Sequence, residues 1–274
     1  RSHSMPAPLR LLAAIALASS LSACSSSASI SPRASGSPPP PPASTPVAPT
    51  PDVTGTPGPY TFDDEFDGTS LGAVWQQHFD VPGVVNTWSL SEATVANGLL
   101  SITASQQAGA WVSALIDTKE TWTQQYGRFE ARIQVPEGQG LWPAFWSYRS
   151  GPGGAAELDP MEICSSPLGT NGGNDVGLLH QTVHWRGDGQ QAQNTRTGDL
   201  GGGFHVYAVD WRADHVTFYL DGRQTWTFAD PANIPAAPLP VILDLAVGGS
   251  YCGPPDASTP ATATMLVDWV HVLP

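Results

Sequence analysis

The sequence predicts an all-β domain built as one sandwich of two stacked antiparallel sheets. Segments rich in β-branched and aromatic residues recur at short intervals between residues 60 and 274, and several of them alternate apolar with polar positions. The chain of 274 residues contains 28 Gly and 27 Pro, which favour many turns. No segment of this range shows the apolar period of a long helix. Many strands without a separate block of helices are typical of a sandwich.

The expected strands follow one another along the whole range. Segment 126–135 alternates most clearly, because its odd positions from Phe129 to Val135 are apolar and its even positions are polar or charged. A period of two predicts a strand with one buried face. Asp221-Gly222 separates two such runs and predicts a tight hairpin turn. The predicted strands cover residues 99–103, 112–116, 126–135, 181–185, 204–211, 215–220, 239–247 and 265–272.

The charge balance restricts the classes of partner. The formal net charge is −13, and the chain has only 11 Lys and Arg. Binding to phosphates needs clustered basic side chains, so we expect neither a nucleic-acid partner nor an anionic membrane surface. A hydrophobic content of 41% is enough for one substantial core. We expect the domain to be a monomer.

Residues 1–23 are typical of an export signal. Arg10 lies in a short apolar run from Leu9 to Ala23 that is too short to cross a bilayer comfortably. The run ends in Leu21-Ser22-Ala23-Cys24, which resembles a bacterial lipobox. The resemblance implies cleavage before Cys24 and attachment of lipid to its thiol. An ordinary signal peptide with an incidental cysteine is the alternative.

Residues 24–59 consist almost wholly of small residues and proline. Such a stretch cannot bury a core and predicts a disordered, partly polyproline tether between the anchor and the folded domain at 60–274. We therefore expect an exported protein, either attached to the cell surface or secreted. Its only contact with a membrane would be the N-terminal lipid.

The densest group of acidic residues is Glu157-Leu158-Asp159-Pro160-Met161-Glu162. On a regular strand Glu157 and Asp159 would share a face, while Glu162 would point away. One extra residue in a β-bulge restores the parity, and Pro160 is a plausible place because proline within sheets is confined to edges and bulges. All three carboxylates would then share one surface and raise at least one pKa. Two carboxyls with different pKa values are what cleavage of a glycosidic bond requires.

A solvated acidic turn and a calcium loop are the alternatives for this segment. Leu158, Met161 and Ile163 alternate with the acids, which favours a strand with an apolar back over a calcium loop. Shortly upstream, segment 141–146 places three large rings within five positions. Sugar rings stack on such faces, so its Trp142 and Trp146 are candidate substrate-binding residues. Packing of either ring in the core is the alternative.

Six segments follow one another in a characteristic order. They are Phe62–Gly68, Tyr126–Arg132, Trp142–Trp146, Phe204–Trp211, Leu245–Gly249 and Met265–Val270. Together they resemble glycoside hydrolase family 16, the laminarinase and lichenase group, over nearly all of residues 60–274. The resemblance implies a catalytic domain with a concanavalin-like β-jelly-roll. Its two curved antiparallel sheets would form a concave glycan-binding cleft.

Carried over position by position, the resemblance implies that Glu157 is the nucleophile and Glu162 the acid/base. Asp159 would orient the nucleophile. His184 resembles a family histidine on the strand beside the acids and is a candidate substrate contact, with a structural role as the alternative. Family members commonly have an aliphatic residue where Pro160 stands.

The resemblance implies a retaining endo-glycosidase acting on β-linked polysaccharide, and we expect β-1,3-glucan as its substrate. A transglycosylase on cell-wall glycan is one alternative. The other is a surface lipoprotein that binds glycan without cleaving it. We expect no required cofactor.

The remaining cysteines and the metal sites complete the predictions. With Cys24 assigned to lipid, Cys164 and Cys252 are left as a disulfide pair in an oxidising compartment, and two free buried thiols are the alternative. His180 and His184 lie four positions apart, but no third metal ligand is evident at a suitable spacing. The family resemblance also allows a structural calcium ion on the convex side, near residues 65 and 268.

Overall fold

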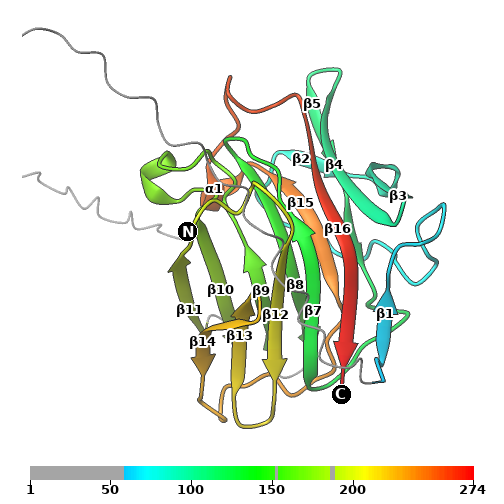
Figure 1. Ribbon diagram of the computed structural model, residues 1–274, viewed down its shortest axis with the longest axis vertical. Helices are drawn as coiled ribbons and strands as arrows, with labels where there is room; N and C mark the ends of the chain where they lie inside the picture. The colour runs from blue at the N-terminus through cyan, green and yellow to red at the C-terminus, as the bar shows by residue number, and fades with distance from the viewer. Residues whose placement is uncertain (1–58, 152–153, 186–188) are drawn as a thin grey trace, which may run out of the picture. The chain divides into compact units, whose positions relative to one another are not determined.

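The computed structural model describes residues 59–151, 154–185 and 189–274. The predicted export signal, Cys24 and nearly all of the predicted tether lie outside these residues. The described chain forms two sheets, which confirms the all-β class (Figure 1). Its helical structure is limited to α1 (Gly249–Cys252) and the 3-10 turns η1 (Leu90–Glu92) and η2 (Asn171–Gly173). None of the helices described is long and apolar enough to cross a membrane.

Ten strands form the larger sheet. They are β1 (Phe62–Asp64), β2 (Asn86–Trp88), β3 (Ala93–Ala96), β4 (Leu99–Gln107), β5 (Ala110–Ser113), β7 (Gly127–Gln134), β12 (His205–Trp211), β13 (Val216–Leu220), β14 (Arg223–Phe228) and β16 (Thr262–Leu273). The order is β14-β13-β12-β7-β16-β4-β5-β2, with β1 beside β16 and β3 beside β4. Its pairings are antiparallel except that of β2 with β5.

The smaller sheet has six strands. They are β6 (Leu115–Asp117), β8 (Leu141–Gly151), β9 (Gly154–Glu162), β10 (Leu178–Trp185), β11 (Gly189–Arg196) and β15 (Ile242–Val247). The order is β11-β10-β9-β8-β15-β6, and every pairing is antiparallel. The acidic segment therefore lies on β9, beside the aromatic segment on β8.

The core lies between the sheets because each sheet turns one face inward. On β7 the predicted alternation is confirmed: Phe129, Ala131 and Ile133 are buried, and the charged residues between them are partly exposed. From the smaller sheet, Leu158 and Met161 join the same hydrophobic cluster. Burial of one such side chain stabilises the fold by about 1.5–3 kcal/mol. The acids of β9 thus point to the face of the smaller sheet that is turned away from the core.

The hairpin predicted at Asp221-Gly222 is confirmed. It joins β13 to β14, and the two residues have φ angles of 50° and 72°, as a type I′ turn requires.

The prediction of a single strand over residues 112–116 is wrong. β5 ends at Ser113 and β6 begins at Leu115, so the chain passes from the larger sheet to the smaller one at Ala114. Residues 113–116 are all buried, and the composition of the run does not mark the crossing. β11 was not predicted because it is an exposed edge strand without an apolar face.

Candidate active site

A β-bulge in β9 brings the three acids to one face. Along β10, the two steps from His180 to Thr182 match the three steps from Glu162 to Asp159. Along β8, the two steps from Phe145 to Ser147 match the three steps from Met161 to Leu158. Both neighbouring strands therefore place one extra residue between positions 159 and 161, which confirms the bulge predicted at Pro160.

The backbone of the bulged residue Pro160 leaves no polar group without a hydrogen-bond partner. Proline has no N–H to leave unpaired, and the carbonyl oxygen of Pro160 accepts a hydrogen bond from Gln181 Nε2 at 3.1 Å. Both residues are buried. A buried carbonyl without a partner would destabilise the strand by about 1–3 kcal/mol, so Gln181 supports the irregular geometry.

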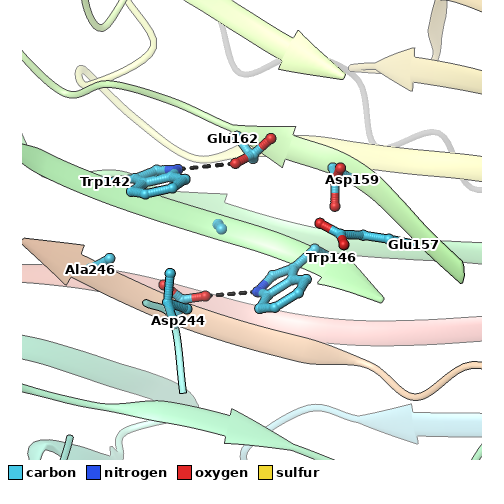
Figure 2. Close-up of a pocket in the computed structure, with 9 residues that line it drawn as sticks. Trp142, Trp146, Glu157, Asp159, Glu162, Asp244 and Ala246 are labelled. Carbon is cyan, nitrogen blue, oxygen red and sulfur yellow. Dashed lines mark hydrogen bonds between the residues drawn. The ribbon is translucent and has the colours of Figure 1, made fainter. Parts of the chain in front are cut away.

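The three acids line one pocket with side chains from β8 and β15 (Figure 2). The lining residues are Val81, Trp142, Ala144, Trp146, Glu157, Asp159, Glu162, Asp244 and Ala246. The pocket thus combines four carboxyl groups with two indole rings. Such a combination offers stacking surfaces to a sugar ring and proton-transfer groups to its glycosidic bond.

Both tryptophans present their rings to the pocket and hold a carboxylate. Trp142 Nε1 donates to Glu162 Oε1 at 3.2 Å, and Trp146 Nε1 donates to Asp244 Oδ2 at 2.7 Å (Figure 2). Both indoles are partly exposed. The alternative that either ring packs in the core is therefore wrong.

His184 lies against the acids. It pairs with Glu157 across the β9–β10 ladder. Its Nε2 is 3.2 Å from Asp159 Oδ2 and 3.8 Å from Glu157 Oε1. Among the described residues, these three offer one ligand atom each within 4.8 Å of one another, so together they could hold a cation.

His180 does not take part in that donor set. Its two ring nitrogens are within hydrogen-bond distance of Asn194 and Asn174. The sequence shows a pair of histidines without a third ligand nearby, whereas the structure groups His184 with two acids.

Burial and mutual repulsion raise the pKa of all three acids. Burial, and next the charge of Asp159, raise the pKa of Glu157 to about 8. Burial, and next the charge of Glu157, raise the pKa of Glu162 to about 7. Burial and the charge of Glu162 raise the pKa of Asp159 well above its ordinary value. Because the groups interact, the site holds protons near neutral pH that titrate as a shared set.

Asp244 is a pocket acid that the sequence analysis missed. It lies on β15, is only 2% exposed, and burial raises its pKa to about 7. The hydrogen bond from Trp146 opposes that shift. The available signal was a single acid inside the apolar run 239–247, since a buried acid needs a partner.

A second aromatic group lies at the Glu157 end of the pocket. The ring of Trp146 is 6.1 Å from that of Tyr148 and 6.2 Å from that of Phe79. Tyr148 pairs with Glu157 across the β8–β9 ladder. Its place two positions after Trp146 could have been recognised from the strand alternation, but Phe79 comes from a distant loop and could not.

The predicted disulfide is present. Cys164 and Cys252 are bonded and fully buried, and the bond closes a sequence separation of 88. It joins the segment after β9 to the end of α1. The alternative of two free thiols is wrong.

The predicted calcium site fits the structure poorly. Glu65 Oε1 lies 2.5 Å from His271 Nε2, and Asp268 pairs with Arg132. A calcium ion would have to replace both of these partners, because it is bound by free oxygen ligands.

Comparison with known proteins identifies the family. The profile described as "Glycosyl hydrolases family 16" matches residues 82–271. The chain belongs to glycosyl hydrolase family 16. Among its relatives, "Beta-glucanase" of Rhodothermus marinus is 30% identical over 249 residues, which cover 81% of this chain and 82% of that protein.

Two longer relatives share the same region. "Endo-1,3-1,4-beta-glycanase EglC" of Rhizobium meliloti (strain 1021) is 30% identical over 77% of this chain and 46% of its own length. "Glucan endo-1,3-beta-glucosidase A1" of Niallia circulans is 29% identical over 83% of this chain and 41% of its own length. The chain thus spans less than half of either protein.

Solved structures of laminarinases share the fold. The laminarinase from Flavobacterium sp. UMI-01 matches 78% of this chain and 100% of its own, with a TM-score of 0.68 and 25% identity. The laminarinase from Rhodothermus marinus matches 78% of this chain and 96% of its own, with a TM-score of 0.67 and 27% identity. These matches confirm the predicted family and sandwich.

Proposed function

We propose that this family 16 domain is a retaining, endo-acting glycosidase that hydrolyses β-linked glucan, mainly at β-1,3 linkages. The observation that carries the proposal is the bulge at Pro160, which places Glu157, Asp159 and Glu162 in one pocket beside two indoles. Relatives named as endo-1,3-β-glucosidase, β-glucanase and laminarinase support the substrate class.

The first half of the reaction forms a covalent intermediate. A carboxylate oxygen of Glu157 bonds to the anomeric carbon as the bond from that carbon to the glycosidic oxygen breaks. Glu162 gives its proton to the departing oxygen and becomes ionised. Its pKa of about 7 keeps this proton available at neutral pH.

The second half releases the sugar with its original configuration. Glu162, now a carboxylate, takes a proton from water as the water oxygen bonds to the anomeric carbon. The ester to Glu157 breaks, and the free carboxylate is restored. Two displacements at the same carbon give net retention.

The attack requires an ionised Glu157, although its pKa in the free site is about 8. Glu157 and Asp159 share a hydrogen bond that raises the pKa of Glu157 and lowers that of Asp159, so the attack requires their shared proton to pass to the fully buried Asp159, whose pKa is itself well above its ordinary value. A positive charge on His184 lowers the pKa of Glu157 further. In this proposal Asp159 and His184 position the nucleophile and set its charge, so His184 acts through the acids and is not assigned a substrate contact.

Endo action follows from aromatic surfaces at both ends of the acids. Trp142 lies beside Glu162, and the Trp146 group with Phe79 and Tyr148 lies at the Glu157 end. A glycan chain could therefore continue past the cleaved bond in both directions.

The proposal is tested by release of reducing ends from a soluble β-1,3-glucan and from mixed-linkage glucan. The wild-type chain should cleave the first faster than the second. Glu157→Gln should abolish the release while the fold, followed by circular dichroism, is unchanged. If the wild type and Glu157→Gln released reducing ends at the same rate, the chain could not be assigned as this enzyme.

A non-catalytic glycan-binding protein is the second candidate. It is favoured by one relative, "Beta-1,3-glucan-binding protein" of Penaeus monodon, which is 30% identical over half of this chain. The presence of all three acids argues against it, because three buried, neighbouring carboxyl groups destabilise the fold and glycan binding alone does not require them. The assay of reducing ends separates the two functions.

We also propose that the chain is exported and carries lipid on Cys24. The lipobox-like residues 21–24 support anchoring. The Cys164–Cys252 disulfide supports export, since such bonds persist in oxidising compartments. Mass spectrometry of the protein isolated from its native membrane would show the lipid adduct, and loss of the adduct in Cys24→Ser would assign the site.

A further inference from the structure

Tyr251 is a partly exposed ring that contacts Trp142, one of the residues that line the pocket. Among the described residues, four large apolar side chains are exposed: Val85, Leu90, Leu168 and Tyr251. Tyr251 is the aromatic one and is 38% exposed. Its ring centroid is 5.1 Å from that of Trp142. An exposed ring beside a pocket for a sugar is a surface on which a further sugar can stack.

Tyr251 lies at the Glu162 end of the pocket. The Trp142 ring that it touches donates to Glu162. After burial, the charges of Glu162 and Asp159 contribute most to the raised pKa of Tyr251. The Phe79 and Tyr148 rings lie at the opposite, Glu157 end.

The end of the pocket defines which sugar Tyr251 would meet. In the proposed reaction the anomeric carbon lies over Glu157, and Glu162 protonates the departing oxygen. The leaving sugar therefore extends past Glu162, toward Trp142 and Tyr251. In a transglycosylation, the acceptor sugar would bind at the same place.

The peptide that carries Tyr251 has little stability of its own. α1 has only four residues, and glycines with positive φ stand at both ends: Gly248 at 82°, Gly249 at 88° and Gly253 at 77°. So short a helix is not stable by itself. Glycine also leaves the flanking backbone with many accessible conformations.

The disulfide fixes this peptide to the catalytic strand. Cys252 follows Tyr251 directly, and its partner Cys164 lies two positions after Glu162. Two hydrogen bonds assist: Asn174 Nδ2 donates to the carbonyl oxygen of Tyr251 at 3.1 Å, and Gln139 Nε2 donates to that of Cys252 at 3.2 Å. The covalent bond is the strongest of these ties.

We propose that Tyr251 forms the wall of the leaving-group side of the cleft, and that the Cys164–Cys252 disulfide is the element that positions it there. The inference rests on the proposed function and deepens it. It assigns a specificity-determining contact to Tyr251 and a positioning role, rather than only a stabilising one, to the disulfide.

The test compares a substrate that has sugars on the leaving-group side with one that has none there. Laminarihexaose has sugars there, whereas a 2,4-dinitrophenyl β-laminaribioside has an aryl group that needs no protonation. Tyr251→Ala should lower kcat/KM for laminarihexaose by about tenfold, the equivalent of one lost stacking contact. The aryl substrate should be turned over within about twofold of the wild-type rate. Equal losses on both substrates would overturn the inference.

Two variants control for the ring and for surface changes. Tyr251→Phe keeps the ring and should behave as the wild type on both substrates. Tyr219→Ala removes a partly exposed ring from β13 of the larger sheet, and it should leave both rates unchanged. A loss in Tyr251→Phe as large as that in Tyr251→Ala would contradict stacking as the cause.

The disulfide is tested by the double variant Cys164→Ala/Cys252→Ala, at a temperature where circular dichroism shows it folded. It should lower kcat/KM for laminarihexaose much more than for the aryl substrate, as Tyr251→Ala does. When the disulfide variant is combined with Tyr251→Ala, kcat/KM for laminarihexaose should fall little further. An unchanged rate on laminarihexaose would overturn the positioning role. If the double variant does not fold, Asn174→Ala is used instead, because it removes one hydrogen bond to the Tyr251 backbone. It should lower kcat/KM for laminarihexaose by a smaller factor and leave the aryl substrate unchanged. Equal losses on both substrates would count against the positioning of Tyr251.

Failure of the proposed function gives a different pattern. A wild-type chain that cleaves neither substrate would contradict the glycosidase, not the binding wall. Calorimetric titration with laminarihexaose then decides: weaker binding by Tyr251→Ala supports the wall, and equal binding by both proteins overturns it.

Discussion

Glu157 and Glu162 are five positions apart on one strand and still line the same pocket, because the register of β9 slips by one residue at Pro160. An odd separation on a regular strand would have turned one of them into the core. The site therefore depends on the number of residues between the two acids more than on the chemistry of the bulged residue.

Deleting Pro160 should abolish activity and strongly destabilise the domain. Without the extra residue, one end of β9 must turn its acid toward the core, and burying an unpaired carboxylate costs several kcal/mol. Pro160→Ala keeps the residue count, so it should retain most of the activity. Thermal melts and release of reducing ends from β-1,3-glucan measure both effects, and full activity of the deletion variant would show that the bulge is dispensable.

Glu162→Ala should impair natural glycans far more than substrates with activated leaving groups. General acid catalysis contributes roughly 10²–10⁴-fold, and a dinitrophenolate departs without a proton. The comparison of kcat/KM for laminarihexaose and the dinitrophenyl laminaribioside checks this. Equal loss on both would assign the acid role to another residue.

Asp244→Asn should stabilise the domain increasingly as the pH rises from about 4 to 7. The pKa of Asp244 is raised to about 7 in the folded state, so the folded protein binds more protons than the unfolded chain in this window. The wild type therefore loses stability as the pH rises through it, by an amount on the order of a few kcal/mol. The asparagine does not titrate and can still accept from Trp146.

Thermal melts at several pH values check the behaviour of Asp244. The gap in Tm between the variant and the wild type should widen toward pH 7 and then stay level. Asp214→Asn, an exposed acid beside β13, serves as the matched control and should show no such widening. A gap that is the same at pH 4 and pH 8 would contradict the burial of an ionisable Asp244.

His184→Gln should move the acidic limb of the pH profile of kcat/KM to higher pH. His184 lowers the pKa of both Glu157 and Glu162, so its removal lets those values rise and leaves less ionised nucleophile on the acidic side. The loss of rate should therefore be largest at low pH. His215→Gln, beside β13 of the larger sheet, is the control, and an acidic limb that does not move would argue for a purely structural His184.

Local patterns predicted most of the catalytic strand. The parity of Glu157, Asp159 and Glu162, with a proline between them, was enough to place the bulge, because side-chain direction on a strand depends only on the residue count. The disulfide followed from the small number of cysteines. The alternation on β7 likewise defined its buried face.

Other parts of the site depend on pairings that the sequence does not display. Asp244 reaches the pocket only because β15 lies beside β8. Phe79 meets Trp146 and Tyr148 only because its loop packs against β8. The position of His184 against Glu157 and Asp159 likewise depends on the β9–β10 register. Strand order and register are tertiary properties, so they had to be observed.

The most direct test of the nucleophile is covalent trapping. A 2,4-dinitrophenyl 2-deoxy-2-fluoro-β-laminaribioside should inactivate the wild-type chain by forming an intermediate that is hydrolysed only slowly. Mass spectrometry of the digested protein should find the fluorosugar on Glu157. An adduct on Glu162, or complete inactivation without an adduct on β9, would contradict the assignment of the two glutamates.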